Sequence, residues 1–422
     1  MATLEKINYQ PMIFNPTDNE NTYGFVVNRN RRTTNFFPQI FLSDGEPWHE
    51  ANSYAFYRYL DLNKDIKTID REMNHLSRYA DWLEKEGLHW LHFPKLKRER
   101  CLFRFRGYLI ESRDNQILAP STVSQLLNAV IAFYKWASAK GLAVPRAELF
   151  DDKNITIKFF DKVGFSRTMN VASTELAIPN RKRNCLTLEG GLTPLTKTQA
   201  AILMEHLHDH KNYQLYLMHK TCLLTGCRHE TITSLTIDAL KYAYQDPSVS
   251  NAFRVKVGAG TSVKTKYDVV GDIYFPKTLI KELIEYYESA TAIFRRSKSS
   301  SKHLKLIFLT SQGNPYTRQT FGTLIKRLKN ELIEKGYSEF ARFKFHQLRA
   351  TFGTMLMRSA LKIQGISPSN AIEFVKDAML HKYSATTWKY IKFIEREPIE
   401  DAFLEHLWSV FTGESHENNS AY

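Results

Sequence analysis

Hydrophobic residues recur at three- and four-residue steps through much of the N-terminal half, and this spacing predicts amphipathic helices. Three such helices are expected, over residues 68–87, 98–114 and 120–141. Ser121 or Thr122 is a candidate N-cap for the third helix, because hydroxyl side chains accept hydrogen bonds from the first free backbone N–H groups.

The C-terminal half continues the helical pattern but includes two alternating segments. A helix with Thr196 as its N-cap opens this half, and the strongly apolar stretch 212–226 ends at Gly226. Residues 252–258 and 268–275 alternate apolar and polar side chains around a lysine-rich turn, as two paired strands do. The expected fold is therefore mainly α with a small antiparallel β-sheet.

Changes in composition divide the chain into five segments. The first segment is rich in Asn, Gly, Pro and Asp and has poor apolar periodicity, so we expect an arm with little core of its own. The expected segments are an N-terminal arm (1–61), a helical domain (62–150), a linker (151–192), a second domain (193–412) and a tail (413–422).

The charge balance indicates a polyanionic partner. The 422 residues include 58 Lys and Arg against 44 Asp and Glu, which gives a net charge of +14. A basic excess of this size favours nucleic acid or an anionic membrane surface. No apolar run reaches the ~18 residues that a membrane-spanning helix needs, and four cysteines without CxxC spacing favour a reduced, cytoplasmic chain without a zinc site.

Cationic side chains of the helical domain are candidates for contacts with phosphate groups. Each one alone is more often a solvated surface residue, so the prediction concerns the group as a whole. These candidates are Arg98, Arg100, Arg104, Arg106 and Lys135.

Several segments of the second domain carry residues suited to chemistry on a phosphate. Arg228 follows a helix end in "LLTGCRHET", and Lys264 and Lys266 lie in the turn between the two predicted strands. In "FHQLR", His346 and Arg349 are three residues apart and share a helix face.

The segment "MLHKYSATTWKY" places His381 nine residues before Tyr390. Arginine forks match the non-bridging oxygens of a phosphodiester and neutralise the charge that develops in its transition state. A lysine can protonate a leaving 5′-oxygen, a histidine can accept a phenol proton, and a tyrosine phenolate is a competent nucleophile. The set has no carboxylate pair, which disfavours a two-metal nuclease.

In this order and spacing, the segments resemble the tyrosine recombinases, the phage-integrase family of site-specific recombinases. That family has an Arg after "TG-x", a Lys on a β-hairpin, an "H-x-L-R" motif, and a box His nine residues before the nucleophilic Tyr. The resemblance implies as catalytic residues Arg228, Lys266, His346, Arg349, His381 and the nucleophile Tyr390. Lys264 is the alternative lysine.

Two positions depart from the family pattern. Thr231 stands where the family usually has an acidic residue, with Glu230 directly before it. Leu380 stands in place of the Gly before the box His. These departures put the contributions of the acidic group and of the Gly in question.

The resemblance also implies an architecture and a function. Residues 62–150 would be a core-binding domain that contacts DNA, and 193–412 the catalytic domain. The expected activity is cleavage and rejoining of DNA through a 3′-phosphotyrosine, without ATP, metal or other cofactor, to integrate or excise a mobile element. Expected partners are double-stranded DNA with an attachment site, further copies of the chain in a tetramer on two sites, and accessory DNA-bending proteins, in the cytoplasm at the nucleoid and without a membrane.

Two alternative functions fit the same sequence. A type IB topoisomerase would use similar chemistry without sequence choice, and a non-catalytic relative would only bind DNA. An apolar stripe over residues 399–411 predicts a C-terminal helix, which packs either on its own domain or on a neighbouring protomer.

Overall fold

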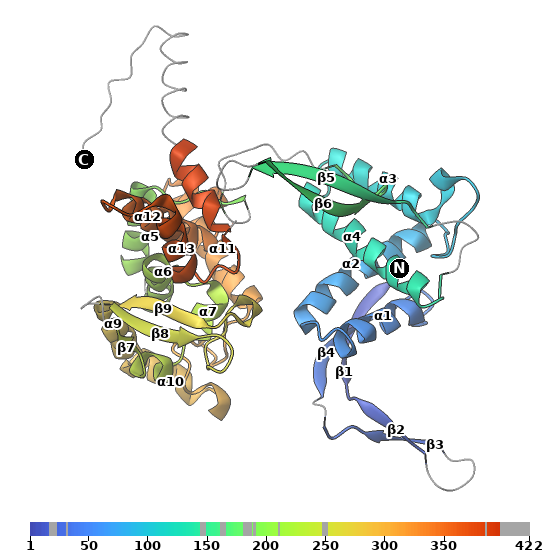
Figure 1. Ribbon diagram of the computed structural model, residues 1–422. Coiled ribbons are helices and arrows are strands. Elements are labelled where there is room, and N and C mark those ends of the chain that lie inside the picture. Colours follow the sequence, from blue (N-terminus) through green and yellow to red (C-terminus); the bar gives the residue numbers. More distant parts are fainter. Residues whose placement is uncertain are drawn as a thin grey trace. The chain divides into compact units, whose positions relative to one another are not determined.

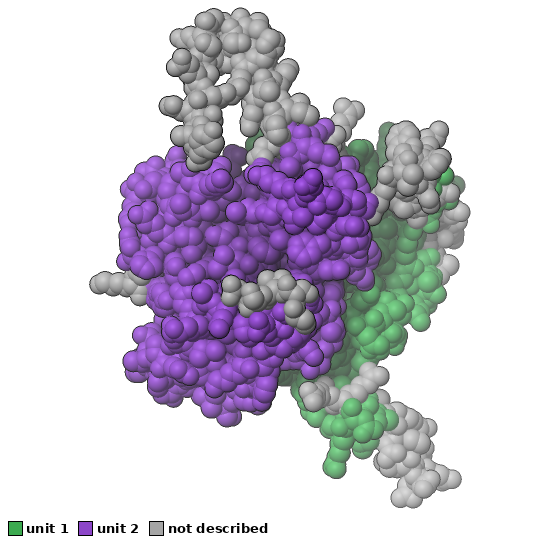
Figure 2. Space-filling model, turned by 60° about the vertical axis from the view of Figure 1, so that its left-hand side comes forward, with its two compact units in different colours: residues 1–182 green, residues 183–422 purple. Residues whose placement is uncertain are grey.

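The computed structural model describes residues 1–16, 23–30, 33–143, 149–160, 166–179, 188, 191–209, 212–246, 252–384 and 386–396. The chain divides into two compact units, residues 1–182 and 183–422 (Figure 1). Figure 2 colours the first unit green and the second purple. The predicted C-terminal stripe at 399–411 and the tail at 413–422 lie outside the described residues.

The first unit combines helices with three two-stranded antiparallel ladders, β1 with β4, β2 with β3, and β5 with β6. Its strands are β1 (Thr3–Tyr9), β2 (Met12–Pro16), β3 (Tyr23–Val27), β4 (Thr34–Phe41), β5 (Asp152–Phe160) and β6 (Ser166–Thr174). Its helices are α1 (His49–Leu60), α2 (Ile66–Lys85), the short η1 (Lys97–Glu99), α3 (Cys101–Asp114) and α4 (Pro120–Ala139).

The three predicted helices of this unit are present as α2, α3 and α4, with one difference at an N-terminus. Helix α4 begins at Pro120, and its N-cap is Ala119, so neither Ser121 nor Thr122 caps it. Proline suits the first helical position because its missing N–H would have no partner there. In the core, the hydroxyls of Tyr79 and Tyr134 lie 2.8 Å apart and join α2 to α4.

The expectation that residues 1–61 form an arm with little core is wrong. Phe37, Ile40, Trp48 and other residues of this segment are buried in the same core as α2, α3 and α4. The buried Asn52 side chain of α1 accepts from Ile40 N–H and donates to Ile40 C=O, which fixes β4 against α1. In β4, the buried residues are consecutive and do not alternate with exposed ones. The sequence therefore lacks the two-residue repeat by which a strand is usually predicted.

The predicted linker 151–192 includes regular structure as well. Strands β5 and β6 pair along their length, from Asp152 with Thr174 to Phe160 with Ser166. After β6, Leu176 and Ile178 are buried in the core of the first unit. Polar residues within these strands gave the segment the composition of a connection.

The second unit is mostly helical around one three-stranded sheet with the order β7-β8-β9. Its strands are β7 (Tyr244–Gln245), β8 (Ala252–Val257) and β9 (Gly271–Pro276). Its helices are α5 (Lys197–Asp209), α6 (Tyr213–Thr225), α7 (His229–Thr233), α8 (Ile237–Lys241), η3 (Lys266–Asp268), α9 (Lys277–Glu288), α10 (Ala290–Ser297), η4 (Ser301–His303), α11 (Arg318–Glu334), η5 (Ser338–Arg342), α12 (His346–Lys362) and α13 (Pro368–Ala378). Residues 386–396 are also helical.

Two apolar clusters hold this unit together. The larger one joins the sheet to α5, α6, α9 and α11. The smaller one joins α12, α13 and the helix at 386–396, with Met357, Ile372 and Tyr390 fully buried in it. Helices α6 and α12 pack against each other and so connect the two clusters (Figure 1).

The predicted fold class, mainly α with a small antiparallel sheet, is confirmed. Strands β8 and β9 pair in an antiparallel register from Ala252 with Pro276 to Val257 with Gly271, around the predicted lysine-rich turn. Thr196 caps α5 as predicted, since its hydroxyl accepts from Gln199 N–H. Within the described part of the chain, none of the helices is long and apolar enough to cross a bilayer.

Candidate active site

The first candidate arginine, Arg228, follows the abrupt end of α6. Gly226 is the C-cap of α6, and its φ of 66° lies in the left-handed region that favours glycine. A Cβ atom on Gly226 would also overlap the Phe352 ring of α12. This turn directs the chain into α7, and Arg228 is the N-cap residue of that helix.

The second candidate arginine, Arg349, is buried in α12 and connects two helix ends. Its Nη1 donates to Gly226 C=O at the end of α6, and its Nη2 donates to Met379 C=O at the end of α13, 2.7 Å away. Both acceptors are C-cap residues, where the helix dipole is negative. The fold therefore stabilises a buried guanidinium without a carboxylate in either of these hydrogen bonds.

The two arginines line one small pocket, although 121 positions separate them in the sequence. Thr231, Thr265 and Leu380 are among the other residues of its wall, and no carboxylate of the described part of the chain is. Two guanidinium groups in the wall of one concave feature are suited to the non-bridging oxygens of a phosphate. We name this feature the arginine pocket.

The two candidate lysines flank the arginine pocket without lining it. Thr265 contributes to the wall, while Lys264 and Lys266 on either side of it are exposed. Lys264 N–H donates to Ser234 Oγ at 2.8 Å, and Lys266 Nζ lies 4.9 Å from the centre of the Tyr267 ring. The geometry does not separate the two lysines, so both remain candidates.

His346 is the first residue of α12 and is half-buried, but it does not line the arginine pocket. It lines a groove of about 550 Å³ between α11, α7 and the start of α12. The other polar or charged residues of this basic groove are His229, Arg318, Lys326, Lys329 and Lys344. His346 and Arg349 thus share a helix but line different hollows.

His381 is placed by the way α13 ends. His381 N–H donates to Lys376 C=O and Leu380 N–H to Asp377 C=O, the bond pair of a Schellman motif. Leu380 occupies the position of this motif that is usually Gly, with φ of 50°. For a residue with a side chain, such a conformation costs about 1–2 kcal/mol. His381 Nδ1 lies 2.9 Å from Thr387 Oγ1, which orients the imidazole.

Tyr390 lies in the helix at 386–396 with its side chain fully buried. Its ring is stacked at 25° to the ring of His381, with the ring centres 6.1 Å apart. Gly353 of α12 packs directly on it, because a Cβ atom there would come within 2.6 Å of the Tyr390 ring. The phenol must therefore become accessible before it can react with a macromolecular substrate.

Comparison with known proteins identifies the domain. Residues 194–393 match the phage integrase family. This domain therefore belongs to the phage integrase family of tyrosine recombinases. No curated protein matches the chain in sequence.

Solved integrase structures are similar to this recombinase. The integrase of the transposon Tn1549, in complex with circular intermediate DNA, is 16% identical, with a TM-score of 0.50 over 81% of this chain and 94% of that one. The lambda integrase dimer bound to a COC′ core site is 12% identical, with a TM-score of 0.48 over 81% and 76%. The lambda integrase tetramer bound to a Holliday junction is also 12% identical, with a TM-score of 0.44 over 80% and 77%.

Three further residues shape the recombinase site, although none of them was a candidate catalytic residue from the sequence. Thr265 was passed over between two lysines, and its hydroxyl donates to Val269 C=O at 2.7 Å, which closes the turn. Thr231 lines the arginine pocket at the position where the family usually has an acidic residue. Gly353 carried no local signal, because its role depends on a contact with a helix more than thirty positions away.

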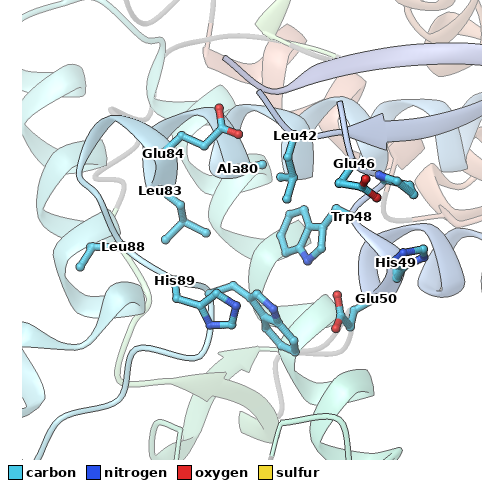
Figure 3. A pocket seen from close by; sticks show the side chains of 12 residues that line it. Leu42, Glu46, Trp48, His49, Glu50, Ala80, Leu83, Glu84, Leu88 and His89 are labelled. Atoms are coloured by element: carbon cyan, nitrogen blue, oxygen red, sulfur yellow. The ribbon is translucent and has the colours of Figure 1, made fainter. Parts of the chain in front are cut away.

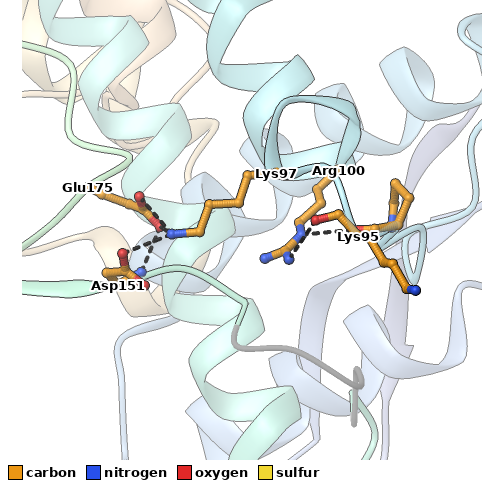
Figure 4. A network of polar contacts seen from close by, with 6 residues as sticks. Lys95, Lys97, Arg100, Asp151 and Glu175 are labelled. Atoms are coloured by element: carbon orange, nitrogen blue, oxygen red, sulfur yellow. Dashed lines mark hydrogen bonds and ion pairs between the residues drawn. The ribbon is translucent and has the colours of Figure 1, made fainter.

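Two of the cations predicted to contact phosphate in the first unit of the recombinase bind backbone carbonyls instead. Arg100 is buried, and it donates to Pro94 C=O and Lys95 C=O (Figure 4). Arg106 donates to Leu176 C=O and so fastens the segment after β6. Their guanidinium groups satisfy backbone carbonyls of the fold, so these two are structural residues.

The other three cations predicted to contact phosphate form ion pairs at the surface. Arg98 pairs with Glu99, Arg104 with Glu86 and Lys135 with Asp152. The neighbouring Lys97 bridges Asp151 and Glu175 (Figure 4). A DNA phosphate would have to compete with these carboxylates, so the three side chains are weaker candidates than their charge alone suggests.

The first unit of the recombinase also has an apolar pocket of about 400 Å³. Trp48, Leu83 and Leu88 are among the residues that line it (Figure 3). Glu46 and Glu50 also lie along it, and carboxylates disfavour a phosphate. None of the candidate catalytic residues lines this pocket.

Proposed function

We propose that this recombinase breaks and rejoins DNA through a covalent bond between Tyr390 and a strand end. The phenol oxygen attacks the scissile phosphorus, and the bond from phosphorus to the 5′-oxygen breaks. The phenol loses its proton and the 5′-oxygen gains one, so the products are a 3′-phosphotyrosine and a free 5′-hydroxyl. Attack by a 5′-hydroxyl from a partner duplex reverses the step, and no ATP is needed because the ester bond is conserved.

The observation that carries this proposal is the arginine pocket beside the Tyr390 helix. Arg228 and Arg349 come from different helices and line one pocket, and Leu380 in its wall directly precedes His381. The ring of His381 in turn stacks on Tyr390. A phosphate held by the arginines would therefore lie close to the segment that orients the nucleophile.

Each candidate has a proposed role. Arg228 and Arg349 clamp the non-bridging oxygens and stabilise the charge of the pentacoordinate transition state. Lys266, with Lys264 as the alternative, protonates the leaving 5′-oxygen. His346 and His381 support proton transfer and the transition state.

The proposed substrate is double-stranded DNA with a specific attachment site. The basic groove supports a phosphate-backbone contact, since Arg318, Lys326, Lys329 and Lys344 line it and, among the described residues, no carboxylate does. We propose residues 62–150, which share their core with residues 1–61, as the core-binding domain and 193–412 as the catalytic domain. The working assembly would be a tetramer on two DNA sites, in the cytoplasm at the nucleoid, with accessory DNA-bending proteins, and the outcome the integration or excision of a mobile element.

The proposed tetramer gives the C-terminal segment a role. We propose that the apolar stripe at 399–411 docks on a neighbouring protomer and couples active sites. Deletion of residues 399–422 would then abolish assembly of two-site complexes while DNA binding by single chains persists. Assembly and cleavage at the full-length rate would exclude this docking.

A nicked suicide substrate tests the proposed function. The attachment sequence is first obtained by sequencing DNA that is covalently trapped on the chain in its host. On that sequence, a nick just 3′ of the scissile phosphate releases a short strand and prevents rejoining. The wild-type chain should accumulate a covalent adduct, while Tyr390→Phe should bind the DNA without one.

The same assay separates the alternatives. Relaxation of any supercoiled plasmid by single chains would instead indicate a type IB topoisomerase. Tight binding without an adduct by the wild-type chain would indicate a non-catalytic DNA-binding protein.

A further inference from the structure

We propose that Leu380 and Gly271 form a matched pair that positions the lysine-bearing turn against the segment of His381. The inference rests on the proposed function, because it concerns delivery of the proton to the leaving 5′-oxygen. Leu380 is a positioning residue in this view, since it acts through the turn that carries Lys264 and Lys266.

The backbone of Leu380 is fixed by the Schellman motif at the end of α13. Its φ of 50° suits glycine, so the local conformation gives no reason for a leucine at this position. Its side chain does have a contact: it packs against the large apolar cluster that contains β8 and β9, and it lines the arginine pocket. The unfavourable backbone thus accompanies a contact that glycine could not make.

The partner of this side chain is Gly271, the first residue of β9. A Cβ atom built on Gly271 would lie 2.5 Å from Leu380 Cδ2, and its next nearest atoms are Leu380 Cγ and Cδ1 at 3.7 and 3.8 Å. Gly271 does not have a positive φ, so its backbone would accept alanine. An added Cβ atom at this position would therefore press on the end of the Leu380 side chain, and either that side chain or the start of β9 would have to shift.

Gly271 marks the place where the lysine-bearing turn returns to the sheet. It pairs with Val257, and the turn from 258 to 270 lies between these two residues. The turn is closed internally, by Gly258 N–H to Val263 C=O at 2.9 Å and by Thr265 Oγ1–H to Val269 C=O at 2.7 Å. A displacement at Gly271 would therefore move the turn, and both lysines with it, relative to the arginine pocket.

A second contact joins β9 to α13 and does not involve Leu380 or Gly271. The rings of Tyr274 in β9 and Phe374 in α13 lie 6.5 Å apart. This contact would keep β9 near α13 when the Leu380 side chain is shortened. Changes at the matched pair should thus alter the position of the turn without separating the two elements.

The experiment enlarges the side chain at residue 271 and shortens the one at residue 380, alone and together, in the full-length chain. Gly271→Ala should slow cleavage of the suicide substrate by about tenfold or more, since about 1.4 kcal/mol of lost transition-state stabilisation is tenfold in rate. Gly271→Ala combined with Leu380→Ala should restore most of that loss, because the overlapping Cδ2 atom is gone. Gly24→Ala, at a strand glycine with nothing within 4 Å of the added Cβ, is the matched control and should leave the rate unchanged.

A second substrate distinguishes positioning of the acid from a general structural defect. Sulfur in place of the leaving 5′-oxygen gives a thiolate that departs without protonation, so this substrate does not need the general acid. The Gly271→Ala defect should shrink to less than about threefold on the sulfur substrate if the pair positions the lysine. An equal defect on both substrates, or a double variant no faster than Gly271→Ala, would overturn the proposal.

Two further outcomes keep the test decisive. If Gly271→Ala does not fold, Leu380→Ala alone is compared on the two substrates, with the same preference for the sulfur substrate expected and an equal defect contradicting the proposal. If the wild-type chain forms no adduct with either substrate, the proposed function itself fails. A wild-type adduct together with equal defects in the variants would reject only the matched pair.

Discussion

Replacement of Arg349 should lower both the stability of the second unit and the rate of DNA cleavage. In the native chain this guanidinium joins the C-terminal ends of α6 and α13 through hydrogen bonds to Gly226 C=O and Met379 C=O. Lysine keeps the charge at this position but cannot reproduce the planar fork that reaches both carbonyls. Alanine removes both bonds and the charge.

The magnitudes follow from these two bonds. A hydrogen bond to a charged group contributes about 1.5–3 kcal/mol, so Arg349→Lys, which retains one bond, should lose that amount. Arg349→Ala should lose about 3–5 kcal/mol, because the two buried carbonyls no longer have a charged donor. This is within the ~5–15 kcal/mol stability of typical domains, so the variant should still fold. Loss of one donor to the transition state should slow cleavage by ~10²–10³.

Hydrogen–deuterium exchange of the full-length chain measures the first effect, because it reports local stability of α6, α12 and α13 separately from the first unit. Adduct formation on the suicide substrate measures the second. Lys362→Ala, at the exposed end of the same helix, is the control and should change neither. If Arg349→Ala exchanges as slowly as the wild type, the bridge between helix ends is refuted; if it cleaves at the wild-type rate, the phosphate clamp is refuted.

Three further predictions follow from the second unit. Burial lowers the pKa of His219 from 6.5 to about 4. As the pH drops from 6.5 to 4, His219 therefore gains a proton in the unfolded chain before it does in the folded chain, and the free energy of unfolding should fall by about 3 kcal/mol. His219→Gln should reduce this loss in acid-unfolding measurements. Burial raises the pKa of the Cys222 and Cys227 thiols, so a thiol-alkylating reagent should label neither in the native chain, and labelling at the rate of a free thiol would contradict their burial. Gly226→Ala should destabilise the unit by more than about 1 kcal/mol in urea unfolding, from its positive φ and from overlap with Phe352, and unchanged unfolding would contradict the turn described here.

Local chemistry explains what the sequence could predict. Thr196 and Gly226 mark the ends of helices because a hydroxyl cap and a left-handed glycine act within a few residues of the chain. Strands β8 and β9 were also predictable, since one of their faces is buried and their side chains alternate.

The parts that were not predicted depend on contacts between distant residues. The burial of β4 arises from α1 and α2, and its clustered buried residues do not alternate. From the sequence, Arg100 could not be distinguished from a surface cation, because its hydrogen bonds to the carbonyls of Pro94 and Lys95 depend on the folded loop. In the same way, the sequence showed Leu380 only as a departure from the family pattern, and the contact of its side chain with Gly271 became visible in the structure.

The central claim concerns the atom that becomes bonded to DNA. The most direct measurement is mass spectrometry of the adduct formed on attachment-site DNA, after digestion of both the DNA and the chain. The account predicts a nucleotide remnant on the peptide that contains Tyr390, linked through its phenol oxygen to a 3′-phosphate. A remnant on another residue, or none on any peptide of a chain that has cut its substrate, would contradict it.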